Sequence, residues 1–236
     1  MKIAIAQTRP IKGDIDSNIQ DHIKWIGIAA ANGADYIFFP ELSVTSYQSE
    51  LAAELAITME DDRLDIFQEL SNDHTITIGV GMPTIGAGGI LISMIVFTPN
   101  NKRQVYSKQL LHEDELPFFI AGQNQLMIDL IAPAICYESL QPSHVQHAHQ
   151  LGAKIYVSSV AKSYTGVEKA YAYYPELAKE YDMPVFMSNC LGPCDDFMSA
   201  GYSSVWNRHG ELLAQLNDID PGLIIWDEDS DQVQIM

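Results

Sequence analysis

The chain has 236 residues, of which 47 % are hydrophobic and 19 % are charged. This balance fits a folded protein with a sizeable core and excludes intrinsic disorder, which needs low hydrophobicity. The formal net charge of −18 disfavours nucleic acids and anionic membrane surfaces as partners, because their phosphate groups would be repelled.

Sequence signals that bear on cellular location are few. No apolar run is long enough to cross a bilayer, and the first residues turn polar too early for a signal peptide. The cysteines are sparse and odd in number, namely Cys136, Cys190 and Cys194. Without a targeting signal, such a set indicates reduced thiols and a cytoplasmic protein.

Hydrophobic periodicity in the first half predicts strands that alternate with helices. The predicted elements are a strand at 2–8, a helix to about residue 32, a strand at 35–39, a helix at 59–72 and strands at 75–82, 90–98 and 103–108. Asp16 or Ser17 is expected to cap the first helix, and Gly33 to end it. The last two strands flank a turn at 99–101 and predict a hairpin.

The second half predicts a similar alternation. Its elements are strands at 125–130 and 132–137, a helix at 142–151, a strand at 155–160, a helix at 166–181, a strand at 184–188 and a β meander over 201–226. The segments 32–37 and 151–156 are alike, and each follows the first helix of its half. Two similar halves predict an α/β fold with two packed sheets and helices outside. No linker divides the chain, so a single domain over residues 1–236 is expected.

Three residues stand where α/β proteins place reactive groups. Cys136 ends an apolar strand just before a helix, where backbone N–H groups can hold an oxyanion and favour a thiolate. Glu41 follows an aromatic strand, where burial would raise its pKa and suit it to act as a base. Lys108 ends a strand in a lysine-poor chain. Taken singly, these residues are better explained as an inert buried thiol, a turn acid and a surface lysine.

Together, the segments around these residues resemble the nitrilase, or carbon–nitrogen hydrolase, superfamily. Pro40-Glu41, Tyr106-Ser107-Lys108 and Ile135-Cys136-Tyr137-Glu138 stand in the order of the three signature segments. The opening IAIAQTRPIKGDIDSNI, the segment GADYIFFPELSVTSY and the late strands at 184–189 and 200–205 also resemble the family. The resemblance covers nearly the whole chain and is to the amidase-like branch.

The resemblance implies a role for each matching residue. Cys136 would be the nucleophile, and Glu41 the general base that later protonates the leaving amine. Lys108 and the backbone N–H of Tyr137 would hold the oxyanion. A further family glutamate between the lysine and the cysteine matches Glu115, with Glu113 as the weaker match.

The resemblance also implies the fold and the reaction. It implies a four-layer αββα sandwich, in which two mixed sheets carry helices on both outer faces. Helices would pair two copies into a homodimer, or several into a higher homo-oligomer, without a metal or an organic cofactor. The reaction would be hydrolysis of a small amide or N-carbamoyl compound through an acyl-thioester. Acyl transfer to an amine and a catalytically silent binding protein remain alternatives.

Three segments depart from the usual family pattern. Relatives often have glycine before the tyrosine of Thr45-Ser46-Tyr47, and a glycine-containing strand in place of Ala132-Pro133-Ala134. The segment 158–163, SSVAKS, replaces residues that are often aromatic in amidase branches. Because that loop is expected to line the pocket, the choice among amides, N-carbamoyl compounds and nitriles stays open.

The remaining clusters favour structural explanations. His144, His147 and His149 lack zinc-site spacing and are expected on a solvated helix face. Cys190 and Cys194 are not spaced as a redox C-x-x-C pair, so we expect structural thiols.

Overall fold

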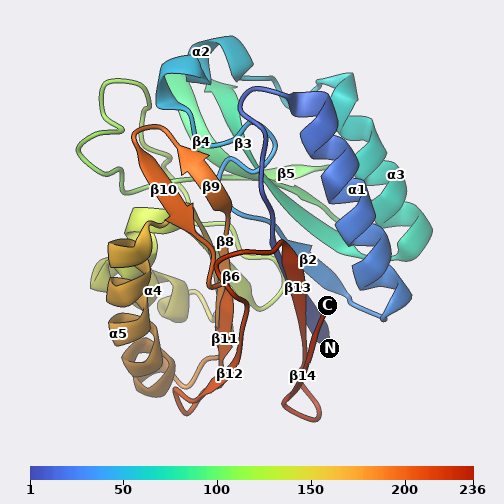
Figure 1. The fold of residues 1–236 in the computed structure, drawn as a ribbon, viewed down its shortest axis with the longest axis vertical. Coiled ribbons are helices and arrows are strands. Elements are labelled where there is room, and N and C mark those ends of the chain that lie inside the picture. The colour runs from blue at the N-terminus through green and yellow to red at the C-terminus, as the bar shows by residue number, and fades with distance from the viewer.

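The computed structural model describes residues 1–236, and two mixed β-sheets lie face to face at its centre (Figure 1). The larger sheet has seven strands in the order β14-β13-β1-β2-β3-β4-β5, and the smaller has five in the order β12-β11-β8-β7-β6. The first sheet contains β1 (Lys2–Gln7), β2 (Tyr36–Phe38), β3 (Thr77–Gly86), β4 (Gly89–Phe97), β5 (Gln104–Ser107), β13 (Gly222–Asp227) and β14 (Gln232–Ile235). The second contains β6 (Ile131–Ile135), β7 (Ile155–Val160), β8 (Val185–Asn189), β11 (Ser204–Trp206) and β12 (Leu212–Gln215).

Helices cover the outer face of each sheet. Helices α1 (Ile15–Ala31) and α3 (Asp65–His74) lie on the seven-stranded sheet, and α4 (Pro142–Gln150) and α5 (Tyr164–Tyr181) on the five-stranded one (Figure 1). The short α2 (Ala52–Leu55) and the hairpin of β9 (Leu191–Cys194) and β10 (Phe197–Ala200) lie toward one end. The expected four-layer αββα sandwich is confirmed.

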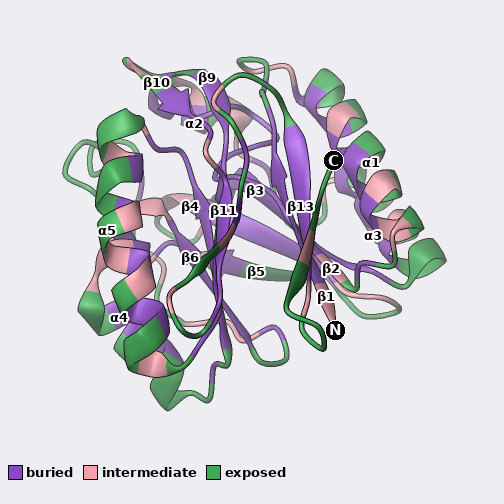
Figure 2. Ribbon diagram, turned by 60° about the horizontal axis from the view of Figure 1, so that its bottom comes forward, coloured by how far each residue is buried: buried purple, intermediate pink, exposed green.

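Three apolar cores separate the four layers, as the buried interior in Figure 2 shows. Side chains alternate along each strand, so β1 sends Ile3 and Ile5 into the core between the sheets and Ala4 and Ala6 toward α1. The third core lies between the five-stranded sheet and helices α4 and α5. Both faces of the central strands are therefore buried, which explains their nearly continuous apolar sequences.

The two halves share one supersecondary unit. In the first half, β1 and β2 pair in parallel around α1, and in the second half β6 and β7 pair in parallel around α4. The sequence similarity between 32–37 and 151–156 marks the same helix-to-strand turn in both units. Because the two strands of each unit run parallel, their carboxyl ends lie at the same end of the sandwich, where the candidate site lies.

Helix starts differ in detail from the sequence prediction. The cap of α1 is Asp14 rather than Asp16 or Ser17, and its side chain accepts the Ser17 N–H at 3.1 Å. Helix α3 begins at Asp65, six residues later than expected, because residues 57–61 instead form a bridge and a turn beside β3. Ser163 caps α5 by accepting the N–H of Gly166 at 3.4 Å.

Two strand predictions were wrong, and one hairpin was not predicted. Residues 125–130 form no strand and make one bridge, from Ile128 to Ile131. The β9–β10 hairpin was not expected. The predicted C-terminal meander is divided between the sheets, because β12 pairs with β11 while β13 pairs antiparallel with β1. Periodicity identifies a strand but carries no information on which sheet it joins.

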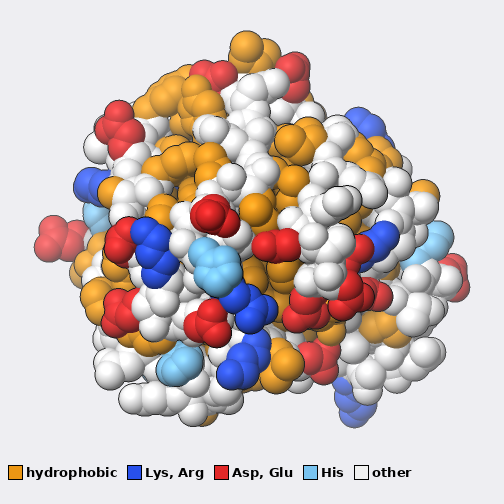
Figure 3. Space-filling model, turned by 90° about the horizontal axis from the view of Figure 1, so that it is seen from below, with side chains coloured by type: hydrophobic (Ala, Val, Ile, Leu, Met, Phe, Trp, Pro, Cys, Tyr) orange, Lys and Arg blue, Asp and Glu red, His pale blue; other side chains and the backbone are white.

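The surface reflects the acidic composition. Figure 3 shows one face of the molecule, on which Asp and Glu side chains are spread among a few basic ones. No helix combines the length and the apolar character that crossing a membrane would require.

Candidate active site

Four segments that follow strand ends meet between the two sheets. Glu41 follows β2 and Lys108 follows β5, both from the seven-stranded sheet. Cys136 follows β6 and Lys162 follows β7, both from the five-stranded sheet. Strand ends at such a junction leave side chains free to point into a shared pocket.

Cys136 occupies a sharp turn between β6 and a 3₁₀-helix over Cys136–Leu140. Its φ of 47° is in the left-handed region, which costs a non-glycine residue free energy and is commonly retained at functional sites. Its Sγ lies 3.7 Å from the Ala161 carbonyl oxygen and 3.8 Å from Lys162 Nζ. The turn presents the thiol beside the N–H of Tyr137, in the first turn of a helix, where amides lack intrahelical acceptors.

Lys108 holds two carboxylates together in the buried interior. Its Nζ donates to Glu41 Oε1 at 2.8 Å and to Glu115 Oε1 at 2.5 Å. Burial alone would lower the pKa of Lys108, but the two carboxylates outweigh it and hold that pKa above its ordinary value. Glu115 also accepts the Tyr47 hydroxyl at 2.8 Å and the His112 N–H at 2.8 Å, which fixes its orientation.

Glu41 keeps one carboxylate oxygen free of any hydrogen-bond partner. Its Oε2 is buried and unpaired, whereas its Oε1 is bound to Lys108. Burial raises the pKa of Glu41 to about 7, although Lys108 opposes the rise. Such a carboxylate can exchange a proton near neutral pH, as a general base must.

A glycine in β3 allows the Glu41 segment to lie close to the sheet. A Cβ on Gly81 would come within 2.4 Å of both the Pro40 carbonyl oxygen and the Leu42 nitrogen. Real Cβ atoms do not approach other atoms so closely, so only glycine permits this backbone contact. Gly81 thereby fixes the depth at which Glu41 is placed.

The thiol carries its proton when the pocket is empty. Burial and the neighbouring Glu41 raise the pKa of Cys136 to about 11, and Lys162 and Lys108 oppose the rise. Since this pKa lies above that of Glu41, the sulfur holds the proton more strongly than the carboxylate does. A thiolate at this position would therefore require transfer of the thiol proton to a neighbouring base such as Glu41.

Behind the thiol, Glu138 joins the loops that carry Lys108 and Cys136. Its Oε1 accepts the Tyr106 hydroxyl at 2.6 Å and the Ile135 N–H at 2.7 Å. Its Oε2 accepts the N–H groups of Gln109 at 2.6 Å and Leu110 at 3.2 Å. Four donors and no acceptor indicate an ionised carboxylate.

The thiol opens into a small cavity of about 230 Å³. The loop carrying Tyr47, the loop after β5, the loop after β7 and the β10 residue Phe197 all contribute to its walls. Its lining residues are Tyr47, Lys108, His112, Asp114, Glu115, Cys136, Tyr137, Leu140, Ala161, Lys162, Ser163, Gly166, Lys169 and Phe197. A cavity of this size suits a small molecule.

The structure brings Glu41, Lys108, Glu115 and Cys136 into one cluster, as the sequence predicted. Glu113 is exposed and does not line the cavity, so Glu115 is the better match to the family glutamate. The 158–163 loop lines the cavity through Ala161, Lys162 and Ser163, as expected, but sequence reasoning assigned no role to Lys162, Tyr47 or Glu138. A lysine immediately after β7, inside an otherwise apolar and small-residue segment, was the available signal for Lys162.

The other clusters take structural positions. His144 is buried rather than solvated, and its two ring nitrogens lie 2.7 Å from the hydroxyl oxygens of Tyr106 and Tyr156. No group of three or more His, Cys, Asp or Glu side chains is placed to hold a metal ion. Cys190 and Cys194 are buried, with sulfur atoms 3.7 Å apart, and do not line the cavity.

A two-sheet sandwich with a glutamate, a lysine and a cysteine at its inner strand ends is the arrangement of nitrilase-type hydrolases. The chain belongs to the carbon–nitrogen hydrolase family, whose model matches residues 2–235. This match confirms the family that the sequence resemblance indicated. It also confirms that the chain is of the hydrolase class.

Among curated proteins, the chain is similar to two glutamine-dependent NAD(+) synthetases. It is 26 % identical to that of Acinetobacter baylyi over 91 % of this chain and 41 % of the synthetase. It is 24 % identical to that of Thermotoga maritima over 98 % of this chain and 42 % of the synthetase. The chain thus spans about two fifths of the length of these relatives.

Among solved structures, the chain is similar to an amidase from Nesterenkonia sp. AN1. One form of it has a TM-score of 0.85 and 23 % identity, covering 98 % of this chain and 94 % of the amidase. Another form, in complex with butyramide, has a TM-score of 0.86 and 22 % identity, with 98 % and 92 % covered. At this identity the likeness supports the fold.

Proposed function

We propose that this chain hydrolyses the carbon–nitrogen bond of a small amide or N-carbamoyl compound through an acyl-thioester on Cys136. The observation that carries the proposal is the unpaired, buried Oε2 of Glu41 beside a cavity-lining thiol. A carboxylate with a pKa near 7 and a free oxygen is suited to accept the thiol proton.

The reaction follows from these positions in two stages. Glu41 takes the Cys136 proton, and the sulfur attacks the carbonyl carbon. Lys108 and the Tyr137 N–H stabilise the oxyanion, since charge that develops in a buried site is held most strongly by fixed donors. Glu41 then returns the proton to the leaving amine. A water molecule, deprotonated by Glu41, next attacks the thioester. The carbon–sulfur bond breaks, Glu41 returns the proton to the sulfur, and the carboxylic acid leaves.

Glu115 acts on this cycle as a positioning residue. It shares the Lys108 ammonium with Glu41, and its Oε1 also accepts the Tyr47 hydroxyl. Two carboxylates on one ammonium group fix where that group points. We expect Glu115 to set the direction in which Lys108 meets the oxyanion.

The net charge of the chain and the proteins similar to it both bear on the substrate class. A small cavity excludes macromolecules, and the net charge of −18 favours neutral or cationic amides over anionic ones on approach. The similar synthetases are glutamine-dependent, and the similar amidase binds butyramide. Glutamine, butyramide, N-carbamoyl amino acids and the corresponding nitriles therefore form the first panel.

The test combines trapping with mutagenesis. Wild type and Cys136→Ala are exposed to the panel, and intact mass and released ammonia are measured. An acyl adduct on Cys136, with turnover abolished in the variant and its circular dichroism unchanged, is expected. Turnover retained by Cys136→Ala would refute the assignment. Product formed only when an amine is added would replace hydrolysis by acyl transfer, and no adduct with any compound would favour a silent binding protein.

We further propose a homodimer that acts in the cytoplasm. The exposed apolar side chains of Leu151 and Tyr164, at the ends of α4 and α5, are surfaces that a second copy would cover. Three free cysteines fit a reducing compartment. Light scattering that shows a stable monomer at micromolar concentration would refute the dimer, and fractionation of cells expressing the protein tests the location.

A further inference from the structure

Lys162 lies against the reactive sulfur, although it matches none of the signature segments. Its Nζ is 3.8 Å from Cys136 Sγ and 3.5 Å from the Cys136 carbonyl oxygen. The residue is only 5 % exposed and lines the cavity. Both contacts are long for an ammonium group, so its hydrogen-bonding capacity is poorly used in the empty pocket.

The fold holds Lys162 in this direction from two sides. Its backbone N–H donates to Asn189 Oδ1 at 2.8 Å, and its carbonyl oxygen accepts from Asn189 Nδ2 at 3.1 Å and Ala200 N at 2.9 Å. Its side-chain stem lies along Gly166 in the first turn of α5, where an added Cβ would come within 3.1 Å of the Lys162 Cβ. The ammonium group is therefore a built part of the pocket.

The charges of the pocket leave Lys162 without a carboxylate partner. Glu41 and Glu115 are both bound to Lys108, and no carboxylate lies within 4.0 Å of Lys162 Nζ. A buried ammonium group without a carboxylate partner is unfavourable, because it has lost its hydration. The folded protein already bears that cost, so a negative charge that develops on the sulfur meets a fixed, desolvated positive charge.

We propose that Lys162 is a further catalytic residue, which serves as the counter-ion of the Cys136 thiolate. The inference rests on the proposed function. In the first step the Sγ–H bond breaks and an Oε2–H bond forms on Glu41. The negative charge thus moves from the carboxylate beside Lys108 to the sulfur beside Lys162. The total charge of the cluster is unchanged, and each ammonium group has a role in turn.

The electrostatics of the thiol agree with this geometry. Burial and Glu41 raise the pKa of Cys136, and Lys162 opposes that rise more strongly than Lys108 does. Lys108, in turn, is occupied by two carboxylates until charge develops on the substrate oxygen. Lys162 therefore stabilises the negative charge on the sulfur, and Lys108 stabilises the oxyanion.

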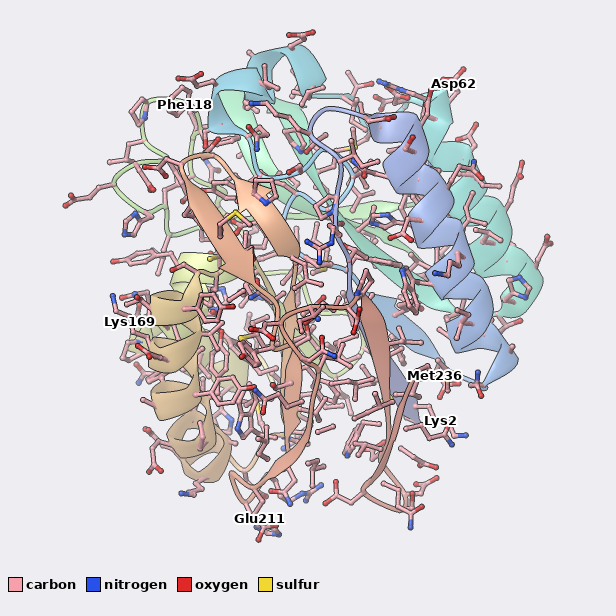
Figure 4. All side chains as sticks on the ribbon, viewed as in Figure 1. Lys2, Asp62, Phe118, Lys169, Glu211 and Met236 are labelled. Carbon is pink, nitrogen blue, oxygen red and sulfur yellow. The ribbon has the colours of Figure 1, made fainter.

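Lys169 provides a matched control within the same cavity. It lies on α5 three residues after Gly166, is exposed, and makes no contact with Cys136 (Figure 4 labels it at the outer side of α5). Replacing Lys162 or Lys169 by Met removes one positive charge from the same pocket in each case. Only the first change removes the ammonium group from beside the sulfur.

The test measures the reactivity of Cys136 without any turnover. Wild type, Lys162→Met, Lys162→Arg and Lys169→Met are treated with iodoacetamide over a range of pH, and alkylation of Cys136 is followed by peptide mass spectrometry. We expect Lys162→Met to react at least about tenfold more slowly at pH 7, with its pH profile moved up by about one unit. Lys162→Arg retains the charge and should recover part of the rate, and Lys169→Met should match wild type.

One result would overturn the proposal, namely an alkylation profile of Lys162→Met that equals that of wild type. If turnover is then lost only with carboxylate-bearing amides, Lys162 binds the substrate carboxylate instead. Should Lys162→Met fail to fold, Lys162→Gln makes the same comparison. Slower alkylation in a protein that hydrolyses no amide would refute the proposed function and, with it, a catalytic role for Lys162, and would leave only the pairing of its ammonium group with the Cys136 thiolate.

Discussion

Replacing Glu138 by Gln should separate the loops that carry Lys108 and Cys136. The carboxylate is fully buried and accepts four hydrogen bonds, two on each oxygen. A Gln side chain keeps one oxygen and replaces the other by an NH₂ group, which would face two N–H donors. With its oxygen toward Tyr106 and Ile135, the amide leaves the N–H groups of Gln109 and Leu110 without an acceptor.

The expected cost follows from that count. A buried donor left without its acceptor costs about 1–3 kcal/mol. Two such donors, both only partly buried, give a loss of roughly 2–4 kcal/mol in the free energy of unfolding. For a chain of 236 residues this corresponds to a fall of roughly 5–15 °C in Tm. Activity should fall as well, because Lys108 precedes the released Gln109.

Thermal unfolding followed by circular dichroism is the assay, with Tyr156→Phe as the control. That variant removes one buried hydroxyl, whose partner is His144 Nδ1, leaves Glu138 and its donors in place, and should lose only about 1 kcal/mol. Glu138→Gln is therefore expected to unfold at a clearly lower temperature than Tyr156→Phe. If the two variants melt together, or if Glu138→Gln melts with wild type, the carboxylate does not hold the loops as described.

Three further predictions concern the site and its support. Gly81→Ala should lower the free energy of unfolding, measured with urea, by about 1–3 kcal/mol. It should also reduce activity, measured as ammonia release, more than Gly79→Ala does, and equal activities would contradict the role of Gly81 in placing Glu41. kcat/KM should fall on the acid side of about pH 7 as Glu41 becomes protonated, and a profile flat from pH 5 to 8 would exclude it as the base. Burial lowers the pKa of His22 to about 4, so the unfolded chain binds its proton first as the pH falls. The contribution of His22 to the free energy of unfolding is fully present above pH 6.5 and should decline by at most roughly 3 kcal/mol toward pH 4. Urea titrations should find no such decline in His22→Gln.

The sequence was sufficient for the positions of Glu41, Lys108 and Cys136, and the reason is local. Each follows an apolar strand, and strand ends of an α/β sandwich meet at one edge, so order along the chain and a family resemblance together predicted the cluster. The same reasoning preferred Glu115 over Glu113, which the hydrogen bonds of Glu115 to Lys108 and Tyr47 support.

What the sequence could not provide depends on packing between distant segments. Lys162 reaches Cys136 only because Asn189 and Gly166 fix its backbone and stem, and neither contact has a local sequence signal. His144 was expected to be solvated because its neighbours on α4 are polar, yet two tyrosines from both sheets enclose it. The assignment of β13 to the first sheet likewise depends on a long-range pairing.

That pairing of β13 with β1 has a consequence for synthesis on the ribosome. Strand β1 is synthesised long before β13. It can pair with β2 early, but the pairing of Lys2 with Asp227 on its other side becomes possible only when β13 has been synthesised. Until the late strands emerge, one edge of β1 is open to pairing with other chains, a known route to aggregation. The pairing therefore delays assembly of the complete sheet until translation has passed β13.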